Sequence, residues 1–153
     1  MSEPTVNRPA LALWMIASLA VAALLLWLGV GLHPPGAESA RTLPASPLTG
    51  AMGFAFLLAW AAFAYAASIT TPHRGAEHAG LGASLLLPLA VVVLLGAEQS
   101  LFALLLAAVW LATLIWTAWT LARREALAGL MMLPVIGSAI ASLLLSVTLW
   151  VLP

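Results

Sequence analysis

The sequence predicts an all-α fold, an integral membrane bundle of five transmembrane helices that forms one domain over residues 1–153. Five long apolar stretches contain no Asp, Glu, Lys, Arg or His, and each has about the 20 residues that a helix needs to cross a bilayer. The five basic and five acidic residues all lie outside them, and 64% of the chain is hydrophobic, which leaves too little polar surface for a protein that faces water. The predicted spans cover residues 10–32, 47–71, 79–97, 100–122 and 126–153.

The first span carries Trp14 and Trp27 near its two ends, where indole rings favour the headgroup level of a membrane. Its apolar run exceeds the roughly 7–15 residues of a signal peptide, and only Arg8 precedes it as a basic residue. We therefore expect this span to be retained. The link that follows, residues 33–46, contains three prolines (Pro34, Pro35 and Pro44), which predicts an extended loop outside the membrane.

The second and third spans carry packing and kinking signals. In the second span, Ala55/Ala59 and Ala62/Ala66 are pairs of small residues that let helices approach closely in lipid. The third span contains Pro88 near its middle, which predicts a kink or the local loss of one hydrogen bond.

The last two spans follow short links. Glu98 and Gln99 predict a tight turn into the fourth span, which ends at Arg123-Arg124-Glu125. The fifth span contains Pro134 in its first half. After this proline come the small residues Gly137, Ser138, Ala141 and Ser142, which predict a helix-contact face.

The composition argues against several classes of function. The absence of Cys excludes disulfides, thiolate metal sites and Cys nucleophiles, and the net charge of zero gives no basic patch for nucleic acid. No ionisable side chain lies within a predicted span, which argues against a proton pump, an ion-coupled transporter, an intramembrane protease or a bis-His haem subunit. We therefore expect a protein that is not an enzyme and has no catalytic residues.

The polar link at residues 72–78 is the nearest approach to a metal site. His73, Glu77 and His78 include the ligand types of several metal centres. The favoured interpretation is an interfacial loop that ends two helices, because three such residues in one short loop are weak evidence. We predict no metal site.

Seven tryptophans are unusual in a chain of this length. Trp14, Trp27, Trp119 and Trp150 lie near span ends, as membrane anchors do. Trp60 and Trp110 lie near the midpoints of their spans. Two interpretations are open for this central pair: the indoles fill a helix interface, which is favoured, or they line a pocket for a flat apolar ligand.

The five short helices, the long first loop, the tight later links and the tryptophans give the chain a family likeness. The C-terminal half carries the local pattern: Leu94-Leu95-Gly96, Ala128-Gly129, Leu133-Pro134, Leu145-Ser146 and Trp150-Val151-Leu152-Pro153. In these features the chain resembles the tryptophan-rich sensory protein family, also called the translocator protein or peripheral benzodiazepine receptor family.

The resemblance implies a five-helix receptor for porphyrins, sterols and related flat apolar molecules. The chain departs from the family at its pocket aromatics. Val135 and Ser138 stand where the family has Tyr and Trp in the fifth helix, Ser146 replaces its Asn, and the Trp-Tyr of the first loop is missing. In the second helix, the family motif is reduced to Pro47, an aromatic at Phe54 or Phe56, Trp60 and Tyr65.

Two functional hypotheses follow. The first is a non-catalytic membrane protein that binds a tetrapyrrole or another flat apolar ligand between helices. Its predicted ligand-binding residues are Trp60, Tyr65 and Trp110, with Pro134 shaping the fifth helix; no cofactor is certain, and a tetrapyrrole or a lipid is the candidate. The second is an accessory structural subunit of a larger photosynthetic or respiratory membrane complex. The expected partners are membrane lipids in both cases, an apolar ligand for the first hypothesis only, and a second copy or a larger membrane assembly.

Composition and charge also predict a location. Abundant Ala and Leu, with Arg in place of Lys, suggest a bacterial inner membrane. With five spans, Arg8, Arg74, Arg123 and Arg124 share one side, and Arg41 alone lies on the other. Because short loops rich in Arg stay in the cytoplasm, the count predicts a cytoplasmic N-terminus and an external C-terminus. The family resemblance implies the reverse, and we follow the charge count.

Overall fold

A computed structural model describes residues 8–31, 47–69 and 75–151. This part of the chain forms helices and no strand, which confirms the predicted all-α class. The elements are α1 (Arg8–Gly31), α2 (Pro47–Ile69), α3 (Gly75–Gly96), α4 (Ser100–Ala122), α5 (Ala126–Met131) and α6 (Leu133–Val151).

The helices have the length and composition of a multi-pass membrane protein. Four stretches are long and apolar enough to cross a membrane: they lie in α1, α3 and α4, and across α5 and α6. A shorter apolar stretch, Phe54–Ile69, lies in α2. The outer surface carries large apolar side chains, among them Ile16, with 71% of its surface exposed, while many core positions hold alanine. This distribution suits helices that face lipid and pack through small residues.

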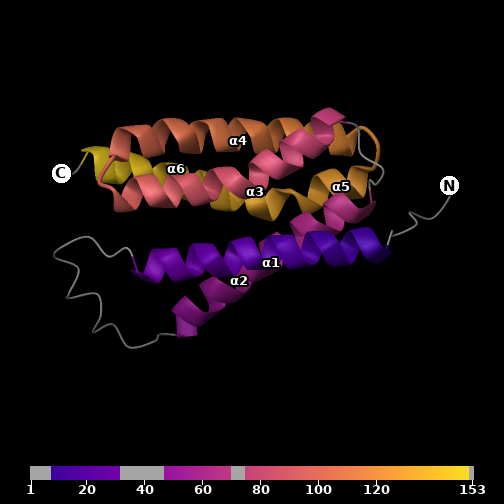
Figure 1. Ribbon diagram of the computed structural model, residues 1–153, viewed down its shortest axis with the longest axis horizontal. Helices are drawn as coiled ribbons and strands as arrows, with labels where there is room; N and C mark the ends of the chain where they lie inside the picture. The colour runs from indigo at the N-terminus through magenta and orange to yellow at the C-terminus, as the bar shows by residue number, and fades with distance from the viewer. Residues whose placement is uncertain (1–7, 32–46, 70–74, 152–153) are drawn as a thin grey trace.

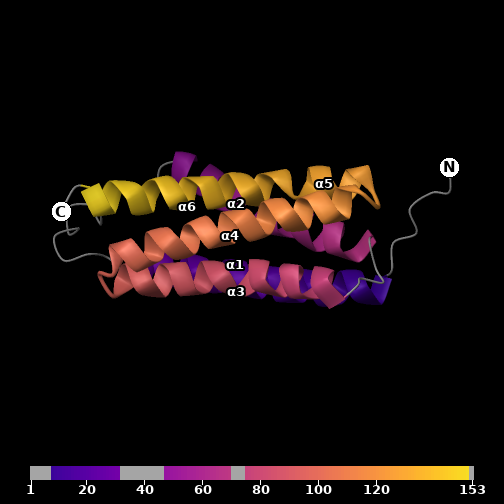
Figure 2. The same ribbon diagram turned by 90° about the horizontal axis from the view of Figure 1, so that it is seen from above.

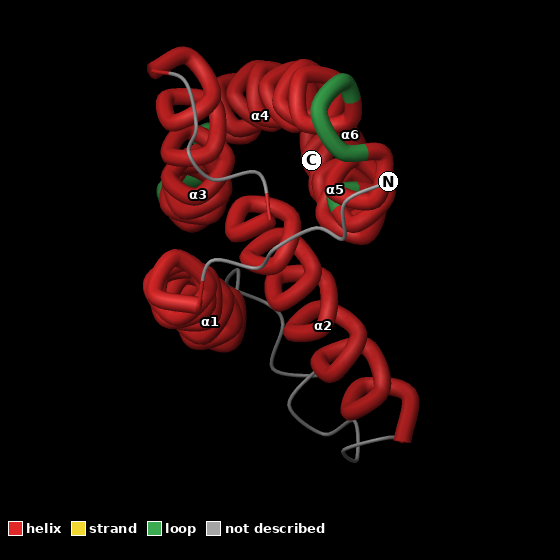
Figure 3. Tube along the Cα trace, turned by 90° about the vertical axis from the view of Figure 1, so that its right-hand side faces the viewer, coloured by secondary structure: helices red, strands yellow, loops and turns green. Residues whose placement is uncertain are grey.

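The described helices alternate in direction (Figures 1 and 2). The start of α1, the end of α2, the start of α3 and the end of α4 lie at one end of the bundle, at the right of Figure 1. Figure 3 shows α3, α4 and the α5–α6 pair arranged in an arc, with α1 beside α3. In the same view α2 runs obliquely, from the middle of the bundle at its C-terminal end to a position outside the bundle at its N-terminal end.

The predicted turn at Glu98 and Gln99 is confirmed. Glu98 adopts a left-handed φ of 58°. The N–H groups of Glu98 and Gln99 bond the carbonyls of Leu95 (3.1 Å) and Leu94 (3.0 Å), so the chain reverses within a few residues.

Two helices differ in detail from the predicted spans. The third span was expected to begin at residue 79, but α3 begins at Gly75, because polar residues such as Glu77 are accommodated in the first turn of a helix, where a negative charge is favourable. The fifth span, predicted to contain Pro134 in its first half, is divided at Met132 into α5 and α6. Pro134 explains this break, since it has no N–H and its ring conflicts with the carbonyl four residues earlier.

The helix-contact face predicted at Gly137, Ser138, Ala141 and Ser142 is covered only in part: Ser138 and Ser142 are half-buried, but Gly137 and Ala141 are exposed. A Cβ added at Gly137 would have nothing within 4 Å. The close approaches lie elsewhere. A Cβ at Gly80 would lie 2.7 Å from the Thr117 hydroxyl and 2.9 Å from the Trp116 ring, and a Cβ at Gly129 would lie 2.5 Å from the Ala122 Cβ. Gly80 therefore sets the separation of α3 and α4.

Gly80→Ala should lower the free energy of unfolding by about 1–3 kcal/mol, because the added methyl overpacks the contact with Thr117 and Trp116. Gly137→Ala is the matched control and should be silent, since it meets open space. Denaturation of the purified variants in detergent micelles measures both. Equal stability of the two variants would show that α3 and α4 do not meet at Gly80.

Candidate functional site

Trp110 is held in the core by a hydrogen bond that Pro88 makes necessary. Pro88 has no N–H, so the carbonyl of Ser84, four residues earlier in α3, lacks its usual helical donor. The indole N–H of Trp110 on α4 donates to this carbonyl at 3.1 Å. Ser84, Pro88 and Trp110 are all buried. The bond satisfies a carbonyl acceptor that is buried away from solvent inside the bundle.

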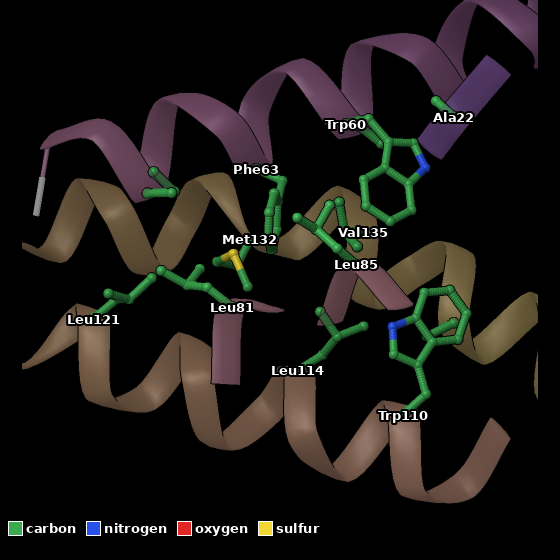
Figure 4. Close-up of a cluster of buried hydrophobic side chains, with 14 of the residues drawn as sticks. Ala22, Trp60, Phe63, Leu81, Leu85, Trp110, Leu114, Leu121, Met132 and Val135 are labelled. Carbon is green, nitrogen blue, oxygen red and sulfur yellow. The ribbon is translucent and has the colours of Figure 1, made fainter. Parts of the chain in front are cut away.

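Trp60 is fully buried among aromatic rings of its own helix. Its ring makes edge-on contacts with Phe56, at a centroid distance of 6.1 Å, and with Phe63, at 5.8 Å. Figure 4 shows Trp60 beside Ala22 of α1. In the described part of the chain no acceptor bonds the Trp60 indole N–H, and no partner bonds the buried Ser18 hydroxyl. Packing thus accounts for the ring of Trp60 but not for its polar atom.

The structure does not bring the four predicted ligand-binding residues together. Trp60 and Trp110 belong to one cluster of buried apolar side chains, together with Leu85 and Val135 (Figure 4). Tyr65 is half-buried and Pro134 is exposed. The two central indoles therefore pack as the favoured interpretation expects, and a direct role of the four residues in ligand binding stays a prediction.

The tryptophans expected near span ends differ in their surroundings. Trp27 and Trp119 are exposed, as anchors are, while Trp14 is half-buried and meets the edge of Phe63 at 6.2 Å. The side chain of Trp150 lies outside what the structure describes. Trp116, which the sequence analysis did not single out, is exposed on α4 and lines a groove described below.

The polar link contains an ion pair in place of the metal site that was considered there. Arg124 Nη2 lies 3.0 Å from Glu77 Oε1, which joins the first turn of α3 to the turn between α4 and α5. Glu77 is buried and His78 is exposed. His73 lies outside the described residues. Within the described ranges no group of three or more His, Asp or Glu residues is placed to hold a metal ion.

An open groove runs between α3 and α4, with a volume of about 610 Å³. Its α3 wall is made of small residues: Ala76, Ala79, Gly80 and Ala83. Its α4 wall is made of Val109, Ala112, Thr113 and Trp116. The Thr113 hydroxyl donates to the Val109 carbonyl at 2.8 Å, so this polar side chain is already satisfied within its own helix. The groove therefore presents an almost wholly apolar lining with one large flat ring.

A sequence signal for this groove exists. Residues 76, 79, 80 and 83 follow the spacing of one helix face and are all Ala or Gly. The signal becomes a groove only when α3 is placed against α4, with Trp116 at its side.

No family model, curated protein or solved structure matches this chain. The site is therefore interpreted from its own geometry.

Trp110→Phe should lower the free energy of unfolding by about 1–3 kcal/mol, because it leaves the buried Ser84 carbonyl without a donor. In a Pro88→Ala background the same substitution should cost less, since position 88 then supplies a backbone N–H to that carbonyl. Denaturation of the four proteins in micelles gives the coupling energy.

The control for this cycle is Trp60→Phe, which removes an indole N–H that bonds no acceptor in the described structure. It should show no coupling to Pro88→Ala. An identical cost of Trp110→Phe in both backgrounds would mean that the bond to Ser84 contributes nothing.

Proposed function

We propose that this protein is a non-catalytic multi-pass membrane protein that binds an apolar ligand in the groove between α3 and α4. The supporting observation is the groove itself, which sets the exposed Trp116 ring opposite small side chains. Ligand pockets are typically lined by apolar and aromatic side chains. The groove suits either ligand class that the sequence suggests, a tetrapyrrole ring or a lipid chain.

The central tryptophans support this placement, because both side chains are already packed in the core. The Trp110 N–H is bonded to Ser84, and the Trp60 ring is covered on all its surface by neighbouring side chains. A flat ligand between them would have to displace packed core residues. Binding at the α3–α4 groove requires no such rearrangement.

We further propose that the membrane is a bacterial inner membrane and that the N-terminus is cytoplasmic. Arg8, Arg123 and Arg124 lie at the same end of the described helices, which supports the charge count made from the sequence. Arginines in short flanking segments favour the cytoplasmic side.

Protoporphyrin, a flat apolar probe, should quench the tryptophan fluorescence of the purified protein in a saturable way. Ala79→Leu should abolish saturation, because a leucine side chain fills the groove. Ala141→Leu is the matched control, since Ala141 is exposed on α6 outside the groove. The absence of saturable quenching by wild type, or the same quenching in all three proteins, would refute binding of a flat tetrapyrrole in this groove.

Orientation is tested with fusions at the C-terminus. Alkaline phosphatase fused there should be active and green fluorescent protein dark, because the proposed topology exports the C-terminus. The opposite pair of results would place the N-terminus outside.

A second candidate function is that of an accessory subunit in a larger membrane complex. It is favoured by the N-terminal part of α2, which leaves the bundle (Figure 3) and exposes Phe54 (65%) and Leu58 (53%). Such a face suits a neighbouring transmembrane helix. Native mass spectrometry after gentle solubilisation separates the two functions, since a lone monomer or homodimer speaks against the subunit.

A further inference from the structure

We infer that the occupant of the α3–α4 groove is an anionic phospholipid, with an acyl chain in the groove and its phosphate at Arg123. This inference rests on the proposed function and names the ligand class of the same site. Its basis is the position of one arginine relative to the groove.

Arg123 continues the α4 side of the groove. Val109, Trp116 and Arg123 are spaced seven residues apart, so they lie on one face of α4 at successive double turns. On α3 the groove residues begin at Ala76, in the first turn of the helix, which is the end of α3 that meets Arg124. The groove therefore runs toward the same end of the bundle as Arg123. About 10 Å of helix separates Trp116 from Arg123, which is well within the reach of one acyl chain.

Arg123 is also available for an anion. Its guanidinium carbon lies 5.2 Å from the centroid of the Trp119 ring, and the residue is exposed. Stacking on an aromatic face leaves the N–H groups at the edge of a guanidinium directed outward, in the geometry that binds phosphate. The neighbouring Arg124 is engaged by Glu77.

Other charged groups at this end modulate but do not cancel the site. Among the described residues they are Glu77, which is buried and bonded to Arg124, Glu125, and Arg8 at the start of α1; the ionisable His78 also lies here. Trp119 is exposed near the C-terminal end of α4, and exposed indoles near the ends of membrane spans favour the headgroup level. A basic side chain beside a groove between membrane helices is the arrangement that recognises anionic headgroups.

The open side of the groove favours a lipid over a soluble ligand. The groove is open along the outer face of α3 and α4, where the neighbouring side chains Val109, Ile115 and Trp116 are exposed apolar groups. A bilayer lipid reaches it by lateral diffusion and never leaves the membrane.

The test uses the purified, delipidated full chain in a mild detergent. Native mass spectrometry follows titration with phosphatidylglycerol or with phosphatidylcholine of the same acyl chains. Wild type should prefer phosphatidylglycerol, and Arg123→Gln should lower that preference about fivefold, as expected for roughly one arginine at a membrane surface. Arg123→Lys should largely restore the preference, since it keeps the positive charge.

Two further variants separate the possible failures. Arg8→Gln removes an exposed arginine at the same end, on α1, and should leave the preference unchanged. Ala79→Leu should weaken binding of both lipids by filling the groove. If wild type binds both lipids equally and Ala79→Leu still weakens that binding, the preference for an anionic headgroup is overturned, while the groove remains the binding site. Binding that Ala79→Leu leaves unchanged would overturn the groove as a site, and with it the proposed function.

Discussion

The hydrogen bond from the Trp110 indole to the Ser84 carbonyl is the contact on which the arrangement of α3 and α4 depends. A buried proline in the middle of a helix frees a carbonyl, and an unpaired carbonyl in a dry interior costs about 1–3 kcal/mol. Because one indole on α4 meets that need, α3 cannot slide along α4 without losing the bond. Gly80 then sets how closely the two helices approach, and the groove lies along the seam that these two residues define.

Hydropathy predicts most of the helices because charge and apolarity change abruptly at their ends. The bounds of α4 agree with the predicted span, since Glu98 and Arg123 flank a run without charged residues. The same signal misplaces the start of α3, because a helix extends through polar residues for as long as its backbone bonds continue and Glu77 finds a partner. It also overlooks the break at Met132, because Pro134 interrupts the backbone and leaves the hydropathy unchanged.

The candidate site is harder to predict, because a groove belongs to two helices at once. A small-residue pattern marks Gly137 and Ala141 as clearly as it marks Ala76, Ala79 and Gly80, yet of the two glycines only Gly80 approaches another helix closely. The pattern records that a close approach is sterically possible and carries no information about which neighbour makes it. Trp110 and Pro88 are likewise separate signals in the sequence. The structure relates them, because Trp110 donates its hydrogen bond to the Ser84 carbonyl that Pro88 leaves without a helical donor.

The ion pair between Glu77 and Arg124 lies at the opposite end of the α3–α4 pair from the turn at Glu98. The two helices are therefore joined by the turn at one end, by the Trp110–Ser84 hydrogen bond in the middle, and by the Glu77–Arg124 ion pair at the other end. Sliding of α3 along α4 would therefore disturb contacts at both ends of the pair and in its middle at once.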